Sequence, residues 1–78
     1  MLLVNTFLEI FMKNFSEHLK SIRKSKGLTQ RNVAVGIDVS ERIYQRYERD
    51  ESKPSFENLW ALADFFEISV DELMGRKM

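Results

Sequence analysis

Apolar residues recur every three or four positions along almost the whole chain, which places them on one face of successive α-helices. Period-two alternation is weak, and one Pro and three Gly leave few breaks. The pattern therefore predicts an all-α protein. Helices are expected over about residues 2–12, 15–26, 30–37 and 41–49, followed by a longer helix after Ser55 and a short one after Ser69. A strand remains an alternative for residues 2–12 because that segment is short.

Polar residues with capping chemistry lie where these helices should begin. Asn14 and Glu17 have the spacing of a capping box, in which side chains satisfy the first free N–H groups. The other expected N-caps are Thr29, Ser40, Ser55 and Ser69. Gly27 should end the helix that starts near Phe15, and Gly36, inside the next helix, should cost about 1 kcal/mol relative to Ala.

The apolar stripes define a candidate core. Its members are Phe15, Leu19, Ile22, Val33, Ala34, Ile37, Tyr44, Tyr47, Leu59, Leu62, Ala63, Phe66, Val70, Leu73 and Met74. The small Ala34 should let the helices on either side of residues 38–39 approach closely. Phe56, Trp60 and Phe65 are the remaining aromatic residues of the expected core region, and they either enlarge the core or form an exposed patch for a second subunit.

Composition limits the chain to one small domain of 78 residues with no Cys, so disulfides and thiolate metal sites are excluded. The net charge is zero but unevenly distributed. Residues 13–53 carry ten Lys or Arg and six Asp or Glu, a net +4, whereas residues 54–75 carry five acids and no base. This asymmetry fits a phosphate-facing surface with an acidic far side, and equally an ordinary uneven surface. No apolar run is long enough to span a membrane, and residues 1–12 make a poor signal peptide.

The segment 39–48 carries the most specific chemistry. A helix capped by Ser40 would bury Tyr44 and Tyr47 and leave an outer face rich in Arg, Gln and Glu. Such a face suits the major groove of DNA, where Arg reads guanine, Gln reads adenine and a carboxylate can accept from cytosine. Residues 29–38 have the spacing of a partner helix and turn, so the two segments together predict a helix-turn-helix.

From Phe15 to Leu73 the chain resembles the Cro/C1-type (XRE-like) helix-turn-helix family of bacterial and phage regulators. The resemblance is carried by the core positions above other than Ile37 and Met74, together with Arg23, Gly27-Leu28-Thr29-Gln30, Val39-Ser40, Glu48-Arg49, Lys53-Pro54-Ser55 and Ile68-Ser69. It implies a five-helix lambda-repressor-like domain over residues 14–75, preceded by an apolar extension over residues 1–13. The family usually has Gly where this chain has Asp38 and Asp50, and each of these should need a left-handed backbone, which Asp tolerates.

The resemblance also implies roles for individual residues. The base-reading positions are Glu41, Arg42 and Arg46, bordered by Gln45, and the expected phosphate contacts are Gln30, Ser40, Arg49 and Lys53. The alternative for each is an ordinary solvated surface residue. Arg23 and Glu48 are expected to form a structural ion pair between two helices of the core.

The extension carries Leu3, Phe7, Leu8 and Phe11 at helical spacing, and these side chains should find an apolar surface. That surface is either the domain's own carboxy-terminal helices or another subunit, and contact with a subunit or partner is favoured because such DNA readers act on two half-sites.

The expected function is that of a cytoplasmic, sequence-specific regulator that binds double-stranded DNA, a repressor acting as a homodimer on a palindromic operator. The alternative is a protein-interaction module such as an antitoxin or anti-repressor, with a protein partner. No residue set supports an enzyme, a metal site or a cofactor.

Overall fold

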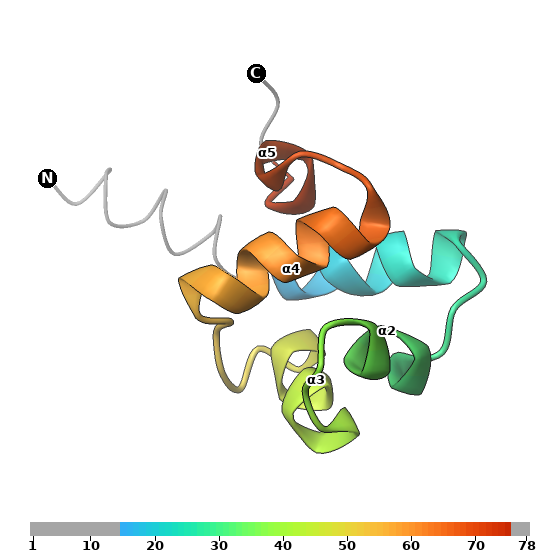
Figure 1. Cartoon of the computed structure of the whole chain (residues 1–78), viewed down its shortest axis with the longest axis vertical. Helices are drawn as coiled ribbons and strands as arrows, with labels where there is room; N and C mark the ends of the chain where they lie inside the picture. The colour runs from blue at the N-terminus through green and yellow to red at the C-terminus, as the bar shows by residue number, and fades with distance from the viewer. Residues whose placement is uncertain (1–14, 76–78) are drawn as a thin grey trace, which may run out of the picture.

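The computed structural model of the protein describes residues 15–75. Within this range there are five helices and no strand (Figure 1). Residues 15–25 are helical, and four helices follow: α2 (Gln30–Gly36), α3 (Glu41–Glu48), α4 (Phe56–Phe66) and α5 (Val70–Leu73). None of them is long and apolar enough to cross a membrane. The helix expected over residues 2–12, its apolar positions and the Asn14 cap lie outside the described residues.

The predicted N-caps are confirmed at α2 to α5. Thr29, Ser40, Ser55 and Ser69 each accept a hydrogen bond from the backbone N–H three residues on. Thr29 belongs to a complete capping box, because the side chain of Asn32 also accepts from the Thr29 N–H. Each short helix therefore satisfies one of its free donors locally, which fixes where it begins.

The helix ends share a left-handed residue. Gly27, Asp38, Asp50 and Glu67 have φ values of 68°, 60°, 61° and 57°. After each one, the next N–H returns to the carbonyl five residues earlier, as Ile68 does to Ala63 at 3.0 Å. The backbone expected at Asp38 and Asp50 is thus confirmed, whereas that at Glu67 was not anticipated.

Replacing Glu67 with Gly should stabilise the protein. A left-handed backbone costs a residue with a Cβ about 1 kcal/mol in conformational free energy, whereas Gly adopts it without this cost. We therefore expect Glu67→Gly to raise the free energy of unfolding by about that amount in urea denaturation. Glu67→Ala is the matched control, because it removes the same charge without relieving the backbone. An equal gain in both variants would assign the effect to charge instead.

One core joins all five helices. Its buried members are Phe15, Leu19, Val33, Ala34, Ile37, Tyr44, Tyr47, Leu62, Ala63, Phe66 and Leu73. All were expected from the sequence, and the other expected members are partly buried against this cluster. In Figure 1, α2 and α3 lie together at one end of the molecule, α4 crosses the middle and α5 lies at the other end. The helix-turn-helix is therefore held on a scaffold made by the remaining helices.

Phe65 packs against the core rather than joining an exposed patch, and Gly36 explains how. A Cβ on Gly36 would lie 2.2 Å from Cε1 of Phe65. The absent side chain thus lets the α4 aromatic ring lie directly on the end of α2. Gly36 lowers the helix propensity of α2, and in return it leaves the space that the Phe65 ring occupies.

We expect Gly36→Ala to lower the free energy of unfolding by about 1–2 kcal/mol. Overpacking typically costs 1–3 kcal/mol, which the better helix propensity of Ala offsets in part. Urea denaturation of Gly36→Ala, Phe65→Ala and the double variant tests this. The double variant should lose less stability than the two single losses combined, because the added methyl then fills space that Phe65 vacates; additive losses would contradict the contact.

Candidate functional site

Helix α3 has one buried face and one exposed face. Tyr44 and Tyr47 are buried, and their rings meet edge to face with centroids 6.3 Å apart. Arg42 and Arg46 are exposed, lie one turn apart and occupy the side opposite Tyr44. Two guanidinium groups are therefore free to reach a ligand along one line of the helix.

A buried ion pair joins α3 to the helix at residues 15–25. Arg23 Nε donates to Glu48 Oε2 at 2.6 Å and Nη2 donates to Oε1 at 3.1 Å, a two-pronged contact. The remaining guanidinium nitrogen, Nη1, donates to the Leu28 carbonyl at 2.9 Å. The side chains are only 9% and 2% exposed. Because guanidinium geometry is rigid, this contact sets both the position and the rotation of α3.

The same network continues to the edge of the exposed face of α3. Gln30 Nε2 donates to Glu48 Oε1 at 3.0 Å, and Gln45 Nε2 donates to Gln30 Oε1 at 3.3 Å. Gln30, expected to contact phosphate, and Gln45, expected to border the base-reading set, therefore bind each other in the free protein. The family resemblance implied the pair of Arg23 and Glu48, which the structure confirms, but it did not indicate this extension, which depends on the packing of α2 against α3.

The network determines the protonation of its members. Burial alone would raise the pKa of Glu48, but hydrogen bonds from Arg23 and Gln30 help to outweigh it and leave the pKa lowered. The hydrogen bond to Glu48 raises the pKa of Arg23, and burial raises the pKa of Tyr44. At neutral pH the cluster therefore consists of a carboxylate, a guanidinium and a neutral phenol.

Acid should weaken the fold through Glu48. Because its pKa is lowered in the folded state, its contribution is complete above the unfolded value of about 4.3 and is lost as pH falls through the folded pKa. We expect the free energy of unfolding to fall more steeply below about pH 4.3 in the wild type than in Glu48→Gln. Urea denaturation across an acid pH series measures both slopes, and equal slopes would contradict the linkage.

The other expected phosphate contacts surround α3. Ser40 caps the helix through its Oγ, which accepts from the Ile43 N–H at 3.1 Å. Arg49 is exposed directly after the helix. Lys53 forms an ion pair with Asp50 across the following loop. A phosphate bound by Lys53 would therefore compete with the Asp50 carboxylate.

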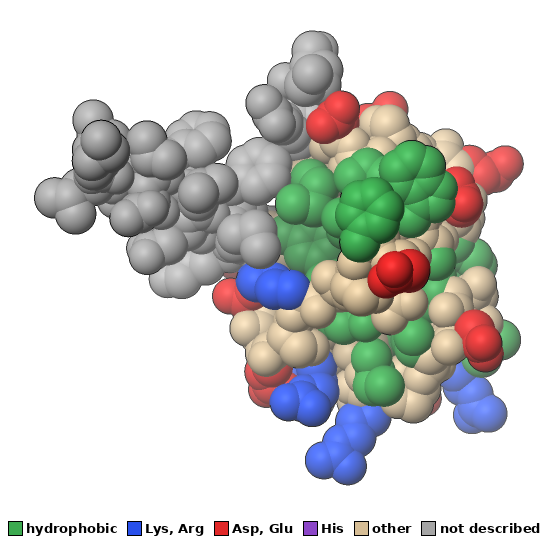
Figure 2. Space-filling view, turned by 60° about the vertical axis from the view of Figure 1, so that its left-hand side comes forward, with side chains coloured by type: hydrophobic (Ala, Val, Ile, Leu, Met, Phe, Trp, Pro, Cys, Tyr) green, Lys and Arg blue, Asp and Glu red, His purple; other side chains and the backbone are tan. Residues whose placement is uncertain are grey.

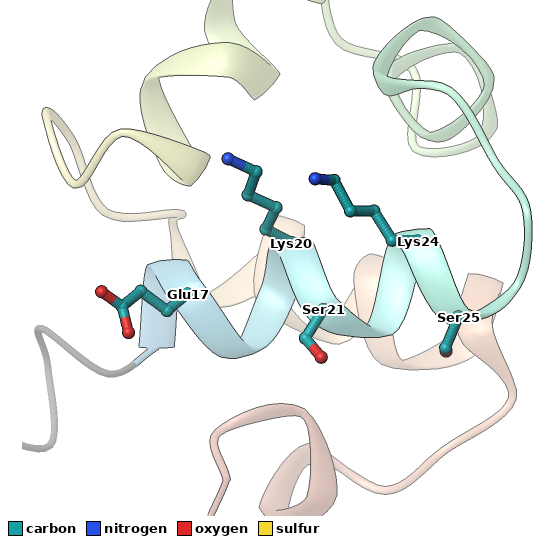
Figure 3. Close-up of a pocket in the computed structure, with 5 residues that line it drawn as sticks. All are labelled: Glu17, Lys20, Ser21, Lys24 and Ser25. Carbon is teal, nitrogen blue, oxygen red and sulfur yellow. The ribbon is translucent and has the colours of Figure 1, made fainter.

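Charge is polarised along the molecule. Figure 2 shows Lys and Arg side chains projecting at the end where Figure 1 places α2 and α3, while the described part of the α5 end shows Asp and Glu. Lys20 and Lys24 line an open hollow on the first helix with Glu17, Ser21 and Ser25, and both lysines extend toward the side of α2 and α3 (Figure 3). These lysines add to the positive field beside the helix-turn-helix.

Ile43 was not singled out from the sequence. It lies on α3 between Arg42 and the buried Tyr44, and it is 44% exposed. Its exposure could have been expected, because it lies about 100° around the helix from Tyr44. An exposed apolar side chain here can contact a thymine methyl group.

Comparisons with known sequences agree on one family. The helix-turn-helix family model matches residues 19–73. The cryptic phage CTXphi transcriptional repressor RstR of Vibrio cholerae serotype O1 is 45% identical over 60 residues, which are 77% of this chain and 54% of RstR. The uncharacterized regulator YqaE of Bacillus subtilis is 35% identical over 60 residues, 77% of this chain and 52% of YqaE. The chain thus spans about half the length of these curated relatives.

Solved structures share the fold. A transcriptional regulator from Listeria innocua superposes with a TM-score of 0.74 at 36% identity, covering 82% of this chain and 60% of that one. The P22 c2 repressor, solved in complex with synthetic operator 9T, superposes with a TM-score of 0.71 at 30% identity, covering 76% of this chain and 89% of that one. The expected five-helix lambda-repressor-like domain is confirmed for the described residues.

Proposed function

We propose, from the premise that this chain belongs to the Cro/C1-type helix-turn-helix family of transcriptional regulators, that it binds a specific sequence of double-stranded DNA and acts in the cytoplasm as a repressor. The observation that carries the proposal is the pair of exposed guanidinium groups on α3, Arg42 and Arg46, on a helix whose opposite face is locked by the Arg23–Glu48 pair. The similar proteins include a cryptic phage transcriptional repressor and a repressor solved in complex with a synthetic operator.

The base-reading set in this proposal is Glu41, Arg42, Gln45 and Arg46. The two arginines are free to donate in pairs to guanine O6 and N7, while Glu41 accepts from cytosine. Gln45 reaches adenine only if it releases Gln30, which it holds at 3.3 Å in the free protein. Its contribution should therefore be smaller than that of an unbound Gln.

The phosphate contacts in this proposal are Gln30, Ser40, Arg49 and Lys53. Ser40 lies at the amino end of α3, Gln30 contacts its carboxy-terminal half, and Arg49 and Lys53 follow that end, so both ends of the helix carry a proposed contact. They position the protein without reading sequence. Asp50 and Glu51 lie within the same loop as Lys53 and should limit the total affinity.

We further propose that the protein acts as a homodimer on a palindromic operator, with half-sites about 34–36 Å apart. Leu3, Phe7, Leu8 and Phe11 supply the subunit contact. The exposed aromatic pair of Phe56 and Trp60 favours a second candidate function, that of a protein-interaction module such as an antitoxin or anti-repressor.

Selection of bound sequences from random duplex DNA separates these functions. The proposal predicts enrichment of one inverted repeat, and an affinity for it that falls steeply with salt because phosphate contacts release counterions. No enrichment, together with salt-insensitive retention, would reject DNA reading and favour the interaction module. Enrichment of a single half-site without symmetry would support sequence-specific DNA binding but reject the palindromic operator.

A further inference from the structure

Phe56 and Trp60 lie one turn apart on α4 and form an exposed aromatic pair. The two residues are 73% and 55% exposed, and their rings stack with centroids 6.0 Å apart. Figure 2 shows hydrophobic side chains gathered on the face it presents. The other large exposed apolar side chains of the described residues, Val35 and Ile43, lie on the helix-turn-helix. Two large rings stacked together in water are the most costly exposed surface of the described domain.

We propose that this pair is the docking site for the amino-terminal segment, residues 1–12, of a second copy of the chain. The inference deepens the homodimer proposed above and rests on it, because it names the surface that receives the segment. Each subunit would give its segment and receive the other's. Such an exchange obeys twofold symmetry, in which a contact between two different surfaces occurs twice.

The composition of the segment matches the aromatic pair. Nine of residues 1–12 are apolar, and Glu9 is the one charged side chain among them. Leu3, Phe7, Leu8 and Phe11 fall on one side at helical spacing. Burial of large apolar side chains is favourable, so two apolar surfaces of one protein cover each other more favourably than either faces water. The segment joins the domain at Phe15, which is only 2% exposed and so anchors it.

Charge argues against pairing the two α4 helices directly. Asp64 lies one turn beyond Trp60, and Glu57 lies next to Phe56; both carboxylates are exposed. A symmetric α4–α4 contact would bring these carboxylates from both copies together in a partly desolvated interface, where like charges repel. The segment contributes only one carboxylate, that of Glu9, and the cation Lys13 follows the segment in the sequence, so this pairing brings less like charge together.

Packing of the segment on its own domain would also shelter the aromatic pair. It would, however, leave the proposed dimer without an apolar contact, because the only other large exposed apolar side chains described are Val35 on α2 and Ile43 on α3, the proposed DNA-reading helix. Exchange between copies covers both surfaces and supplies the contact at once. We therefore assign the docked segment to a second copy of the chain.

Trp60 is the only Trp of the chain, so its fluorescence reports directly on this surface. The full chain, without DNA, is measured by sedimentation equilibrium and by emission wavelength across one concentration series. We expect a dimer, with a blue shift of Trp60 emission that follows its formation. Phe56→Ser and Phe7→Ser should each weaken dimerisation by about tenfold or more while keeping the reporter. Val35→Ser, which truncates an equally exposed apolar side chain, should change neither measurement.

Three results would overturn the proposal. A monomer whose Trp60 emission is blue-shifted at every concentration means that the segment packs on its own domain. A dimer whose emission stays that of exposed Trp means that another surface joins the copies. A monomer with exposed Trp means that neither docking occurs. Because no DNA is present, none of these outcomes bears on sequence-specific binding, and failure of the operator selection would leave this measurement intact.

Discussion

Replacing Arg23 with Met lowers the free energy of unfolding by about 3–5 kcal/mol. The reason is the Glu48 carboxylate, whose side chain is 2% exposed and would lose both of its bonds to the guanidinium. The Leu28 carbonyl would lose its donor as well. A loss of this size is a large part of the total stability of a small domain, so the variant should be partly unfolded at room temperature.

A double-mutant cycle separates the ion pair from the packing of the Arg23 side chain. Arg23→Met combined with Glu48→Leu leaves no buried charge, and it should recover part of the loss seen in either single variant. Lys24→Met is the matched control, because Lys24 is exposed on the same helix, and its change should be within about 0.5 kcal/mol. Small and additive effects of Arg23 and Glu48 in urea denaturation would contradict a structural pair.

The second large effect concerns DNA. Arg42→Ala should weaken binding to the selected operator by about 1–3 kcal/mol, or roughly 5–150-fold, and relax the preference at one base pair. The cause is the loss of two donors from an exposed side chain that has no structural role in the free protein. Titration against the operator and against variants of each base pair, at fixed salt, measures both quantities.

Arg49→Ala provides the comparison for Arg42. Both residues are exposed arginines, but Arg49 follows α3 and is proposed to contact phosphate. Its loss should weaken binding evenly across sequences and reduce the salt dependence by about one counterion. If Arg42→Ala behaves in the same way as Arg49→Ala, Arg42 contacts phosphate and the assignment of base reading to it is wrong.

Features decided by a residue and its immediate neighbours could be predicted from the sequence. Ser40 and Ser55 cap their helices because a hydroxyl meets N–H groups only three residues away. Asp38 and Asp50 are left-handed at helix ends, where the next N–H returns to the carbonyl five residues earlier, and the family resemblance indicated this backbone because Gly is usual at both positions. The buried positions of each helix could be predicted from the helical periodicity of apolar residues, and these positions indicated the all-α fold.

Features that depend on contacts between helices could not be predicted from the sequence. Glu67 offers no local sign of a left-handed backbone, since Glu has no special tolerance for one. Phe65 packs inward only because Gly36 of another helix leaves space for its ring. The bonds from Glu48 through Gln30 to Gln45 depend on how α2 lies against α3, which spacing along the chain does not specify. Among the site residues predicted from the sequence, these bonds change the interpretation of Gln30 and Gln45 most.

Methylation interference on the selected operator tests most directly whether the outer face of α3 enters the major groove. Guanine N7 lies in that groove and adenine N3 in the minor groove. We expect N7 methylation within each half-site to block the wild-type protein, and one of these guanines to lose its effect with Arg42→Ala. Sensitivity to adenine N3 methylation alone, with N7 methylation tolerated throughout, would contradict the proposed mode of binding.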